Sequence, residues 1–217
     1  QALEKVFLYG TQISGTIPVE IADLQNLDLL SLDSTDVSGS IPDGLSSMQA
    51  LSSLGLYNSQ LSGTIPAQLP PLLGDAEVHT TRLSGTLPRA LADLSDSLTE
   101  LLAFSTHLSG TLSPHFSQLS NLEVLQVQNT SLSGTIPDLS GCSKLNMIDL
   151  GRCAITSLPV ALPPSISHLN LARNPIKATA QDLNQLIAPL PLLTVLDASF
   201  VRLDVPLEYN GAQGGYG

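Results

Sequence analysis

The sequence predicts an α/β solenoid of about nine stacked repeats, and three observations carry this prediction. A segment of the form S-G-x-[IL]-P, with one variant ending in Ser, recurs six times and begins at residues 14, 38, 62, 84, 109 and 133. Aliphatic residues precede each copy in the spacing L-x-x-L-x-L-x-x-x-x-L. Aromatic residues make up 4% of the chain and Trp is absent, so the core must be aliphatic. Self-similarity at a period of roughly 20–50 residues is the sequence signature of a stacked architecture.

The repeats span residues 1–207, which are predicted to form a single solenoid, and the Gly-rich residues 208–217 are predicted to form a loose tail. Within each L-x-L segment, alternate residues of an extended strand point to opposite faces, so the leucines face inward. One repeat cannot bury these side chains alone, and stability therefore comes from contacts between neighbouring repeats. The second inward residue of repeats one to nine is, in order, Val6, Leu30, Leu54, Ala76, Leu101, Leu125, Ile148, Leu169 and Leu196.

A bend and a return follow the strand segment of each repeat. The Gly after Ser permits a backbone conformation that a Cβ would obstruct, and the Pro fixes φ and ends the local hydrogen bonding. Stretches such as residues 19–24 and 43–48 then return the chain to the next repeat. The last repeats are less regular, because residues 155–159 read ITSLP, one residue short of the motif, and no S-G-x-I-P follows Ile176. Residues 182–193 are predicted to form a longer, more helical return with apolar residues at Leu183, Leu186, Ile187 and Leu190.

These motifs resemble the plant-specific class of leucine-rich repeat, which is found in receptor-like proteins and polygalacturonase inhibitors. The resemblance implies a right-handed superhelix with a concave parallel β-sheet, short second strands at the S-G-x-I-P segments and 3₁₀ or helical returns. It also implies a module that recognises proteins or peptides. Secreted members of the class carry paired-cysteine caps, and this sequence shows none. We therefore expect either that the caps are absent or that the solenoid continues beyond this chain.

The sequence departs from the family at one inward position, three residues after the second strand leucine, where the family usually carries Asn. A hydroxyl group can still donate to and accept from nearby backbone groups, so we expect a hydroxyl ladder in place of an Asn ladder. In this ladder Cys153 is a weak donor and Val201 cannot take part. The position is occupied, from repeat one to repeat nine, by Thr11, Thr35, Ser59, Thr81, Thr106, Thr130, Cys153, Asn174 and Val201.

Residues that flank the inward leucines are predicted to project from the concave face in columns, one residue per repeat. Several aromatic rings share one column, and an acidic cluster lies beside them. Aromatic anchors with charged neighbours are typical of protein interfaces, whereas scattered exposed apolar residues are ordinary and need no function. The candidate partner-binding residues are Tyr9, Asp33, Tyr57, Asp75, Glu77, His79, Glu100, Leu102, Phe104, Gln126 and Gln128.

The net charge of −11 and the pI of about 4.4 limit the classes of partner. Nucleic-acid binding requires clustered Lys and Arg, which this chain lacks, so no nucleic-acid partner is expected. No apolar run approaches the roughly 20 residues that span a bilayer, and no direct membrane insertion is expected. The negative charge favours a basic protein or peptide, and it is also explained by solubility alone.

We expect no enzymatic activity, no cofactor and no metal. Nucleophilic catalysis brings a nucleophile, a base and an orienting acid together, and the four histidines are predicted to lie on different repeats or faces. His79 with Asp75 and Glu77 could imitate a metal site, but no second His joins them. The four histidines are His79, His107, His115 and His168.

Two sequence features concern the compartment, which we expect to be extracellular or the lumen of a secretory-pathway organelle. Asn129 begins the single N-x-[ST] sequon and would be exposed for glycosylation in a secreted protein, although the sequon also occurs by chance. Cys142 and Cys153 lie one repeat apart, and they form either two buried thiols or a disulfide.

Two alternatives to a binding module stay open. One is a structural or accessory subunit embedded in a larger protein assembly. The other is an ice-binding solenoid, because regular hydroxyl arrays at strand spacing resemble those of ice-binding solenoids, although Ser and Thr also simply suit short exposed strands. The hydroxyl column at the x of S-G-x-I-P consists of Thr16, Ser40, Thr64, Thr86, Thr111 and Thr135.

Overall fold

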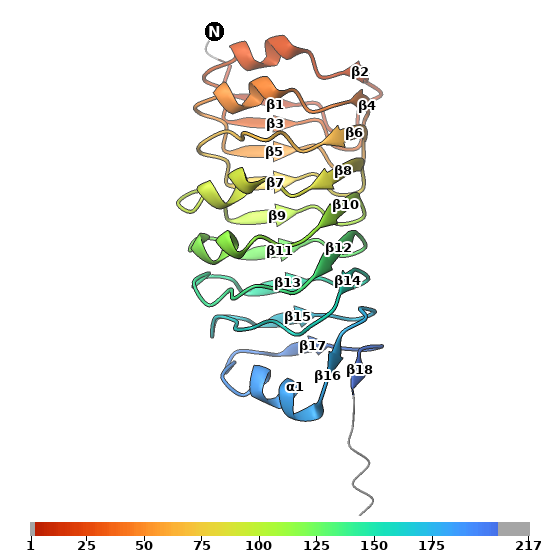
Figure 1. Cartoon of the computed structure of the whole chain (residues 1–217). Coiled ribbons are helices and arrows are strands. Elements are labelled where there is room, and N and C mark those ends of the chain that lie inside the picture. The colour runs from red at the N-terminus through yellow and green to blue at the C-terminus, as the bar shows by residue number, and fades with distance from the viewer. Residues whose placement is uncertain (1–2, 204–217) are drawn as a thin grey trace, which may run out of the picture.

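The computed structural model describes residues 3–203 and shows a stack of short parallel strands that runs the length of the molecule (Figure 1). Each repeat contributes one strand, and consecutive repeats lie next to each other in a nine-stranded parallel sheet. The leucine spacing therefore predicted both the strands and their order. The strands are β1 (Lys5–Phe7), β3 (Leu29–Ser31), β5 (Ser53–Gly55), β7 (Asp75–Glu77), β9 (Glu100–Leu102), β11 (Val124–Gln126), β13 (Met147–Asp149), β15 (His168–Asn170) and β17 (Val195–Asp197).

A second parallel sheet forms at the S-G-x-I-P segments, as the resemblance implied. It joins seven strands, and a separate pair, β16 (Lys177–Ala178) and β18 (Arg202–Leu203), follows it. The seven-stranded sheet ends at the repeat that carries the shortened ITSLP segment. Its strands are β2 (Ser14–Thr16), β4 (Asp36–Gly39), β6 (Gln60–Thr64), β8 (Arg82–Thr86), β10 (His107–Gly110), β12 (Ser131–Gly134) and β14 (Ala154–Ile155).

Four of the returns are short helical turns that begin after the Pro of the motif or, in η4, at the Pro after it. The 3₁₀ turns are η1 (Val19–Asp23), η2 (Asp43–Ser47), η3 (Arg89–Asp93) and η4 (Pro114–Gln118). The α-helix α1 (Ala180–Ile187) is shorter than the predicted return at 182–193 and begins two residues earlier. It begins there because Thr179 and Asp182 form a reciprocal capping box that satisfies two backbone N–H groups.

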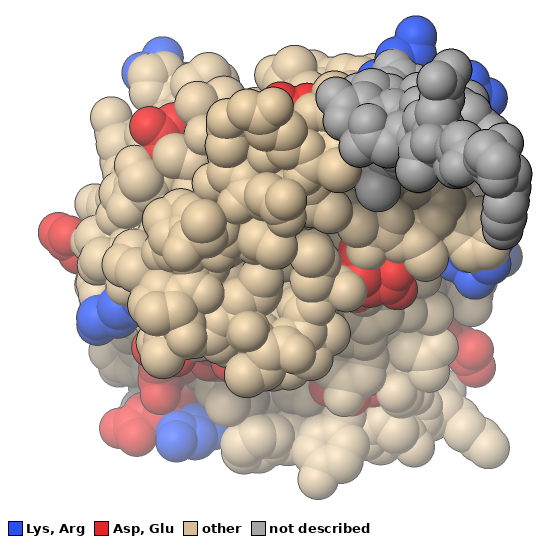
Figure 2. All heavy atoms as spheres, turned by 90° about the horizontal axis from the view of Figure 1, so that it is seen from below, with Lys and Arg blue, Asp and Glu red and all other residues tan. Residues whose placement is uncertain are grey.

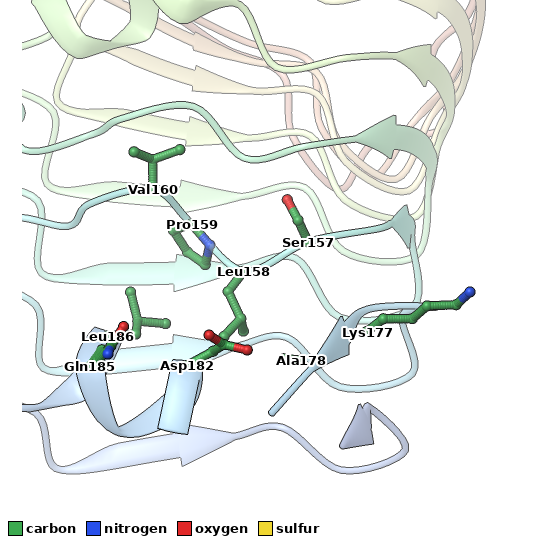
Figure 3. Close-up of a pocket in the computed structure, with 9 residues that line it drawn as sticks. All are labelled: Ser157, Leu158, Pro159, Val160, Lys177, Ala178, Asp182, Gln185 and Leu186. Carbon is green, nitrogen blue, oxygen red and sulfur yellow. The ribbon is translucent and has the colours of Figure 1, made fainter. Parts of the chain in front are cut away.

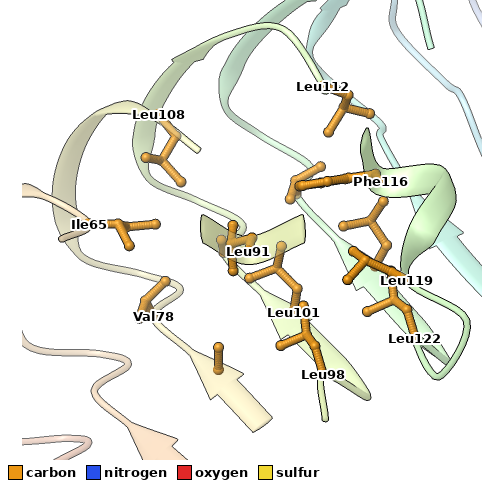
Figure 4. Close-up of a cluster of buried hydrophobic side chains, with 14 of the residues drawn as sticks. Ile65, Val78, Leu91, Leu98, Leu101, Leu108, Leu112, Phe116, Leu119 and Leu122 are labelled. Carbon is orange, nitrogen blue, oxygen red and sulfur yellow. The ribbon is translucent and has the colours of Figure 1, made fainter. Parts of the chain in front are cut away.

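The core is a continuous aliphatic layer between the two sheets. Leu30, Leu54 and Leu125 are buried, as predicted. Side chains from the returns, such as Leu91 and Phe116, belong to the same core cluster as the strand leucines (Figure 4). The first described repeat is more open. Leu3 and Leu8 are 44% and 39% exposed, because no earlier repeat covers them within the described residues.

The predicted hydroxyl ladder is present. The Oγ1 of Thr35 donates to the backbone O of Leu32 at 2.6 Å, and equivalent bonds recur in the repeats that follow. These hydroxyl groups bond backbone groups of their own repeat, and the Oγ1 of Thr130 also lies within hydrogen-bond distance, 3.4 Å, of the Sγ of Cys153 in the next repeat. Asn174 does more, because its side chain bonds backbone groups of both its own repeat and the preceding one.

No helix within residues 3–203 is long and apolar enough to cross a membrane. Seen from the end of the stack that carries α1, the surface is mostly uncharged, and Lys, Arg, Asp and Glu are scattered around its edge (Figure 2). The residues predicted as a tail, 208–217, lie outside the described residues.

Candidate concave binding face

The register of the nine-stranded sheet confirms the predicted columns on its outward side, here called the concave face. Phe7 pairs with Ser31, Ser31 with Gly55, and Gly55 with Glu77, so these residues form one column across repeats one to four. Asp75 pairs with Glu100 in the neighbouring column. Strand pairing thus places the predicted acidic residues side by side on adjacent repeats.

The rings lie in a third column, and a backbone turn with positive φ follows each of its residues in repeats one to five. In these repeats the third column consists of Tyr9, Asp33, Tyr57, His79 and Phe104. The backbone N–H of Asn58 donates to the O of His79 at 3.1 Å, and that of Thr80 donates to the O of Phe104 at 3.0 Å. Non-Gly residues seldom adopt this left-handed conformation, and the sequence pattern did not predict it. It recurs at Ser34, Asn58, Thr80, Ser105, Asn129, Arg152, Arg173 and Phe200.

Three rings of the third column stack face to face. The ring centroids of Tyr57 and His79 are 4.5 Å apart with planes at 13°, and those of His79 and Phe104 are 4.1 Å apart with planes at 9°. Tyr9, which the sequence places in the same column, is not in this stack. Its ring meets Phe7 edge-on at 6.3 Å, because Asp33 occupies the column in the repeat between Tyr9 and Tyr57.

The stack is half-buried and electrically neutral at neutral pH. Burial lowers the pKa of His79 below its ordinary value of 6.5, and the nearby Asp33 carboxylate only partly opposes this effect. A neutral imidazole stacks between Tyr57 and Phe104 without the cost of burying a charge. The three side chains therefore present one continuous aromatic surface across repeats three to five.

Carboxylates lie near the stack on repeats two, four and five, and the pKa values of Glu77 and Glu100 show the repulsion among them. Burial raises the pKa of Glu77, and the charges of Glu100, Asp33 and Asp75 raise it further. Burial also raises the pKa of Glu100, with the charge of Asp75 next in importance. No cation contributes to either shift. This part of the concave face therefore has a negative potential that a cation would relieve.

Asp33 is the most buried of these carboxylates, at 7% exposure. It accepts a hydrogen bond from the hydroxyl of Ser31. A hydrogen bond from Tyr57 to the Asp33 carboxylate is the main cause that raises the pKa of Tyr57. Asp33 thus links the acidic residues to the ring stack.

The remaining predicted binding residues line the face beyond the stack. Leu102 is half-buried in β9, and Nε2 of Gln126 lies 3.1 Å from the Sδ of Met147. The Oε1 of Gln128 is buried and accepts no hydrogen bond from any of the described residues. These three residues continue the face but do not contact the acidic cluster through any hydrogen bond among the described residues.

A hollow of about 270 Å³ opens on the concave face between the ring of Tyr9 and the ring of Tyr57. The predicted site contained only part of its lining. Phe7, Leu29, Ser31, Ser53 and Gly55 were missed as site residues. The signal that could have found some of them is the column in which the small residues Ser31 and Gly55 lie between Phe7 and Glu77. The lining residues are Phe7, Tyr9, Leu29, Ser31, Asp33, Ser53, Gly55, Tyr57 and Glu77.

A second hollow, of about 350 Å³, lies away from this face, between residues 157–160 and helix α1 (Figure 3). It opens where the ITSLP segment is one residue short. Its lining contains no aromatic ring, and Asp182 is engaged in the capping box of α1. Lys177 points away from Asp182 in this view. The concave face is the better candidate site.

The sequon and the cysteines lie apart from the rings. Asn129 is exposed, and its Nδ2 donates to the Oγ of Ser105 at 3.2 Å. Both cysteines are free thiols. Burial raises the pKa of Cys142 to about 11, and its S–H donates to the backbone O of Phe116 at 3.0 Å.

No family model matches the sequence. Among solved structures, the chain is 29% identical to the plant peptide hormone receptor RGFR1 in complex with RGF2, with a TM-score of 0.82 over 93% of this chain and 32% of that one. It is 26% identical to the LRR ectodomain of the receptor kinase GASSHO1/SCHENGEN3 from Arabidopsis thaliana, with a TM-score of 0.83 over 93% of this chain and 24% of that one.

A plant ice-binding protein is also similar, at 25% identity and a TM-score of 0.78 over 93% of this chain and 65% of that chain. The chain thus spans less than two thirds of each of these three structures. With two parallel sheets stacked repeat on repeat, the chain has the leucine-rich-repeat solenoid fold.

Proposed function

We propose that this leucine-rich-repeat solenoid is a non-enzymatic module that binds a peptide or an extended protein segment along the concave face of repeats one to five. The observation that carries the proposal is the stack of Tyr57, His79 and Phe104, three half-buried rings in contact on the concave face. Aromatic side chains dominate the energetic centres of interfaces because they bury large area at little entropic cost.

An extended segment suits the dimensions of the stack. Neighbouring strands lie about 4.8 Å apart, so three stacked rings cover roughly 10 Å, which an extended chain crosses in about three residues. Similarity to a receptor described as binding a peptide hormone supports a peptide partner. We further propose a receptor-like rather than an inhibitor-like role, an extracellular setting, and a partner with basic side chains, which the carboxylates beside the rings favour.

Selection of peptides tests the proposal. A random-peptide display library is panned against the chain, and the affinities of the selected peptides are measured for three proteins. These are the wild type, Phe104→Ala, and the control Val160→Ala, which removes an exposed apolar side chain away from the concave face. We expect Phe104→Ala to weaken binding at least ~10-fold and the control to leave it unchanged.

Charge reversal provides a second arm of the same experiment. The triple variant Asp75→Lys, Glu77→Lys, Glu100→Lys should bind the selected peptides more weakly. Its thermal unfolding midpoint should stay within a few degrees of that of the wild type. Selected peptides that bind both Phe104→Ala and this triple variant as tightly as the wild type would show that the concave face is not the binding site.

A second candidate function, ice binding, is favoured by one specific observation. The side chains of the hydroxyl column at the x of S-G-x-I-P make no hydrogen bond within the described residues, whereas the neighbouring Ser84 donates to the O of Gly63 at 3.1 Å. The Thr64 methyl group packs against Gly85 of the next repeat, where an added Cβ would lie only 2.9 Å away. The column is thus a regular row of exposed, unbonded hydroxyl groups, and a plant ice-binding protein shares the fold.

Thermal hysteresis separates the two candidates. An ice-binding chain would show hysteresis that Thr64→Tyr abolishes and Phe104→Ala leaves unchanged, because Thr64 lies in the seven-stranded sheet and Phe104 lies on the concave face of the other sheet. Absence of hysteresis and of recrystallisation inhibition in the wild type would rule this candidate out.

A further inference from the structure

We propose that the hollow between Tyr9 and Tyr57 binds one arginine side chain of the bound peptide, an inference that rests on the proposed function and names its partner's chemistry. The hollow spans repeats one to four on the concave face. Tyr9, which is exposed, closes it at the N-terminal side, and Tyr57, the end ring of the stack, closes it at the other side.

The floor of the hollow is built from small residues. Ser31 and Gly55 are paired in adjacent strands, and neither fills the space between the two tyrosines. Gly55 does not adopt a positive φ, unlike the glycines of the S-G-x-I-P segments. An added Cβ there would lie 3.4 Å from the Oδ1 of Asp33 and 3.8 Å from the Cβ of Ser31, which are ordinary contacts. The backbone therefore does not require Gly at this position, and the missing side chain leaves room for a ligand group.

The charges at the hollow select a cation. Asp33 and Glu77 both line it, and the charge of Asp33 contributes to the repulsion that Glu77 experiences. A cation placed there is attracted by two carboxylates and lies beside the faces or edges of two tyrosine rings. Among cationic side chains, arginine fits best, since its planar guanidinium stacks on rings and donates to carboxylates in a fixed fork.

A small probe tests the hollow directly. The ¹⁵N-labelled chain is titrated with N-acetyl-arginine N-methylamide and, separately, with the uncharged citrulline analogue of the same shape. We expect saturable shifts of the amide signals of Ser31, Gly55 and Tyr57 with the arginine compound, and no saturable shift with the citrulline compound. Equal binding of the two compounds would overturn the proposal.

Two variants and a control identify the hollow as the site. Gly55→Val fills the space without changing charge, and Asp33→Asn removes a charge at constant size. Each should weaken arginine binding at least ~5-fold, which corresponds to roughly 1 kcal/mol. The control Asp149→Asn removes a carboxylate from the column of Gly55 and Glu77, three repeats beyond Glu77, and it should leave binding unchanged. Unchanged affinity in Gly55→Val, which lies on the strand surface, would contradict the assignment even if Asp33→Asn failed to fold.

The selected peptides separate this inference from the proposed function. If they depend on Phe104 but carry no Arg or Lys and bind Gly55→Val normally, the hollow is not a cation site and the proposed function stands. If no selected peptide depends on Phe104, the proposed function is wrong, and the arginine titration still decides whether the hollow binds a cation.

Discussion

Replacement of Asn174 by Thr should destabilise the solenoid more than any conservative change at the hydroxyl positions of the same ladder. The Nδ2 of Asn174 donates to the O of Leu150 at 2.7 Å and to the O of Leu171 at 3.0 Å, and its Oδ1 accepts from the N of Ile155 at 2.9 Å. A threonine hydroxyl can keep the bond to Leu171, as Thr35 does to Leu32. It cannot reach the preceding repeat.

The variant therefore leaves two buried backbone groups, the O of Leu150 and the N–H of Ile155, without their partner. Each orphaned buried group costs roughly 1–3 kcal/mol, so Asn174→Thr should lower the free energy of unfolding by about 3 kcal/mol. The matched control is Thr106→Ser, which keeps the bond to the O of Ala103 and should cost about 1 kcal/mol or less through the lost methyl group.

Urea-induced unfolding followed by circular dichroism measures both costs, and an unchanged m-value shows that the comparison is valid. If Asn174→Thr costs no more than Thr106→Ser, the bonds that Asn174 makes between repeats do not stabilise the stack, and the reasoning fails.

Three further predictions concern the core and the charges. Leu56→Ala, in a buried repeat, should cost roughly 2–5 kcal/mol in urea unfolding, and Leu8→Ala, at the equivalent but exposed position, clearly less; equal costs would contradict the open first repeat. The raised pKa values of Glu77 and Glu100 mean that ionisation disfavours the folded state, so the double Gln variant should melt above the wild type at pH 7 and lose this advantage as the pH falls towards 4.5. The lowered pKa of His79 means that protonation disfavours the folded state, because the unfolded chain binds the proton more tightly than the folded chain does. The wild type should lose stability relative to His79→Phe as the pH falls through 6.5, and parallel melting curves would refute this.

The sequence predicted the strands and columns because position within a repeat determines which way a side chain faces. Leu30 and Leu125 are buried and Tyr57 lies on the concave face for this reason alone. The same logic predicted the hydroxyl ladder, since the ladder position is inward in every repeat. These features depend on periodicity, which a single sequence contains in full.

Other features depend on side-chain conformation and on what neighbouring repeats contribute. The sequence placed Tyr9 and Tyr57 in one column with Asp33 between them, but only the structure shows that Tyr9 packs against Phe7 and that a hollow opens between the two tyrosines. The sequence places Gly55 at an outward position of the predicted strand, between Leu54 and Leu56, but only the structure shows that it lines a hollow. The left-handed turn at Thr80 could not be predicted, because Thr has no preference for that conformation and hydrogen bonding between repeats imposes it.

Hydroxyl-radical footprinting of the chain with a selected peptide tests the binding face most directly. If the concave face binds the peptide, oxidation of Tyr57 and Phe104 should fall several-fold on complex formation. Oxidation of Phe200, which is 71% exposed and lies beyond the proposed site, should stay unchanged. Unchanged oxidation of Tyr57 and Phe104 in a saturated complex would contradict the account.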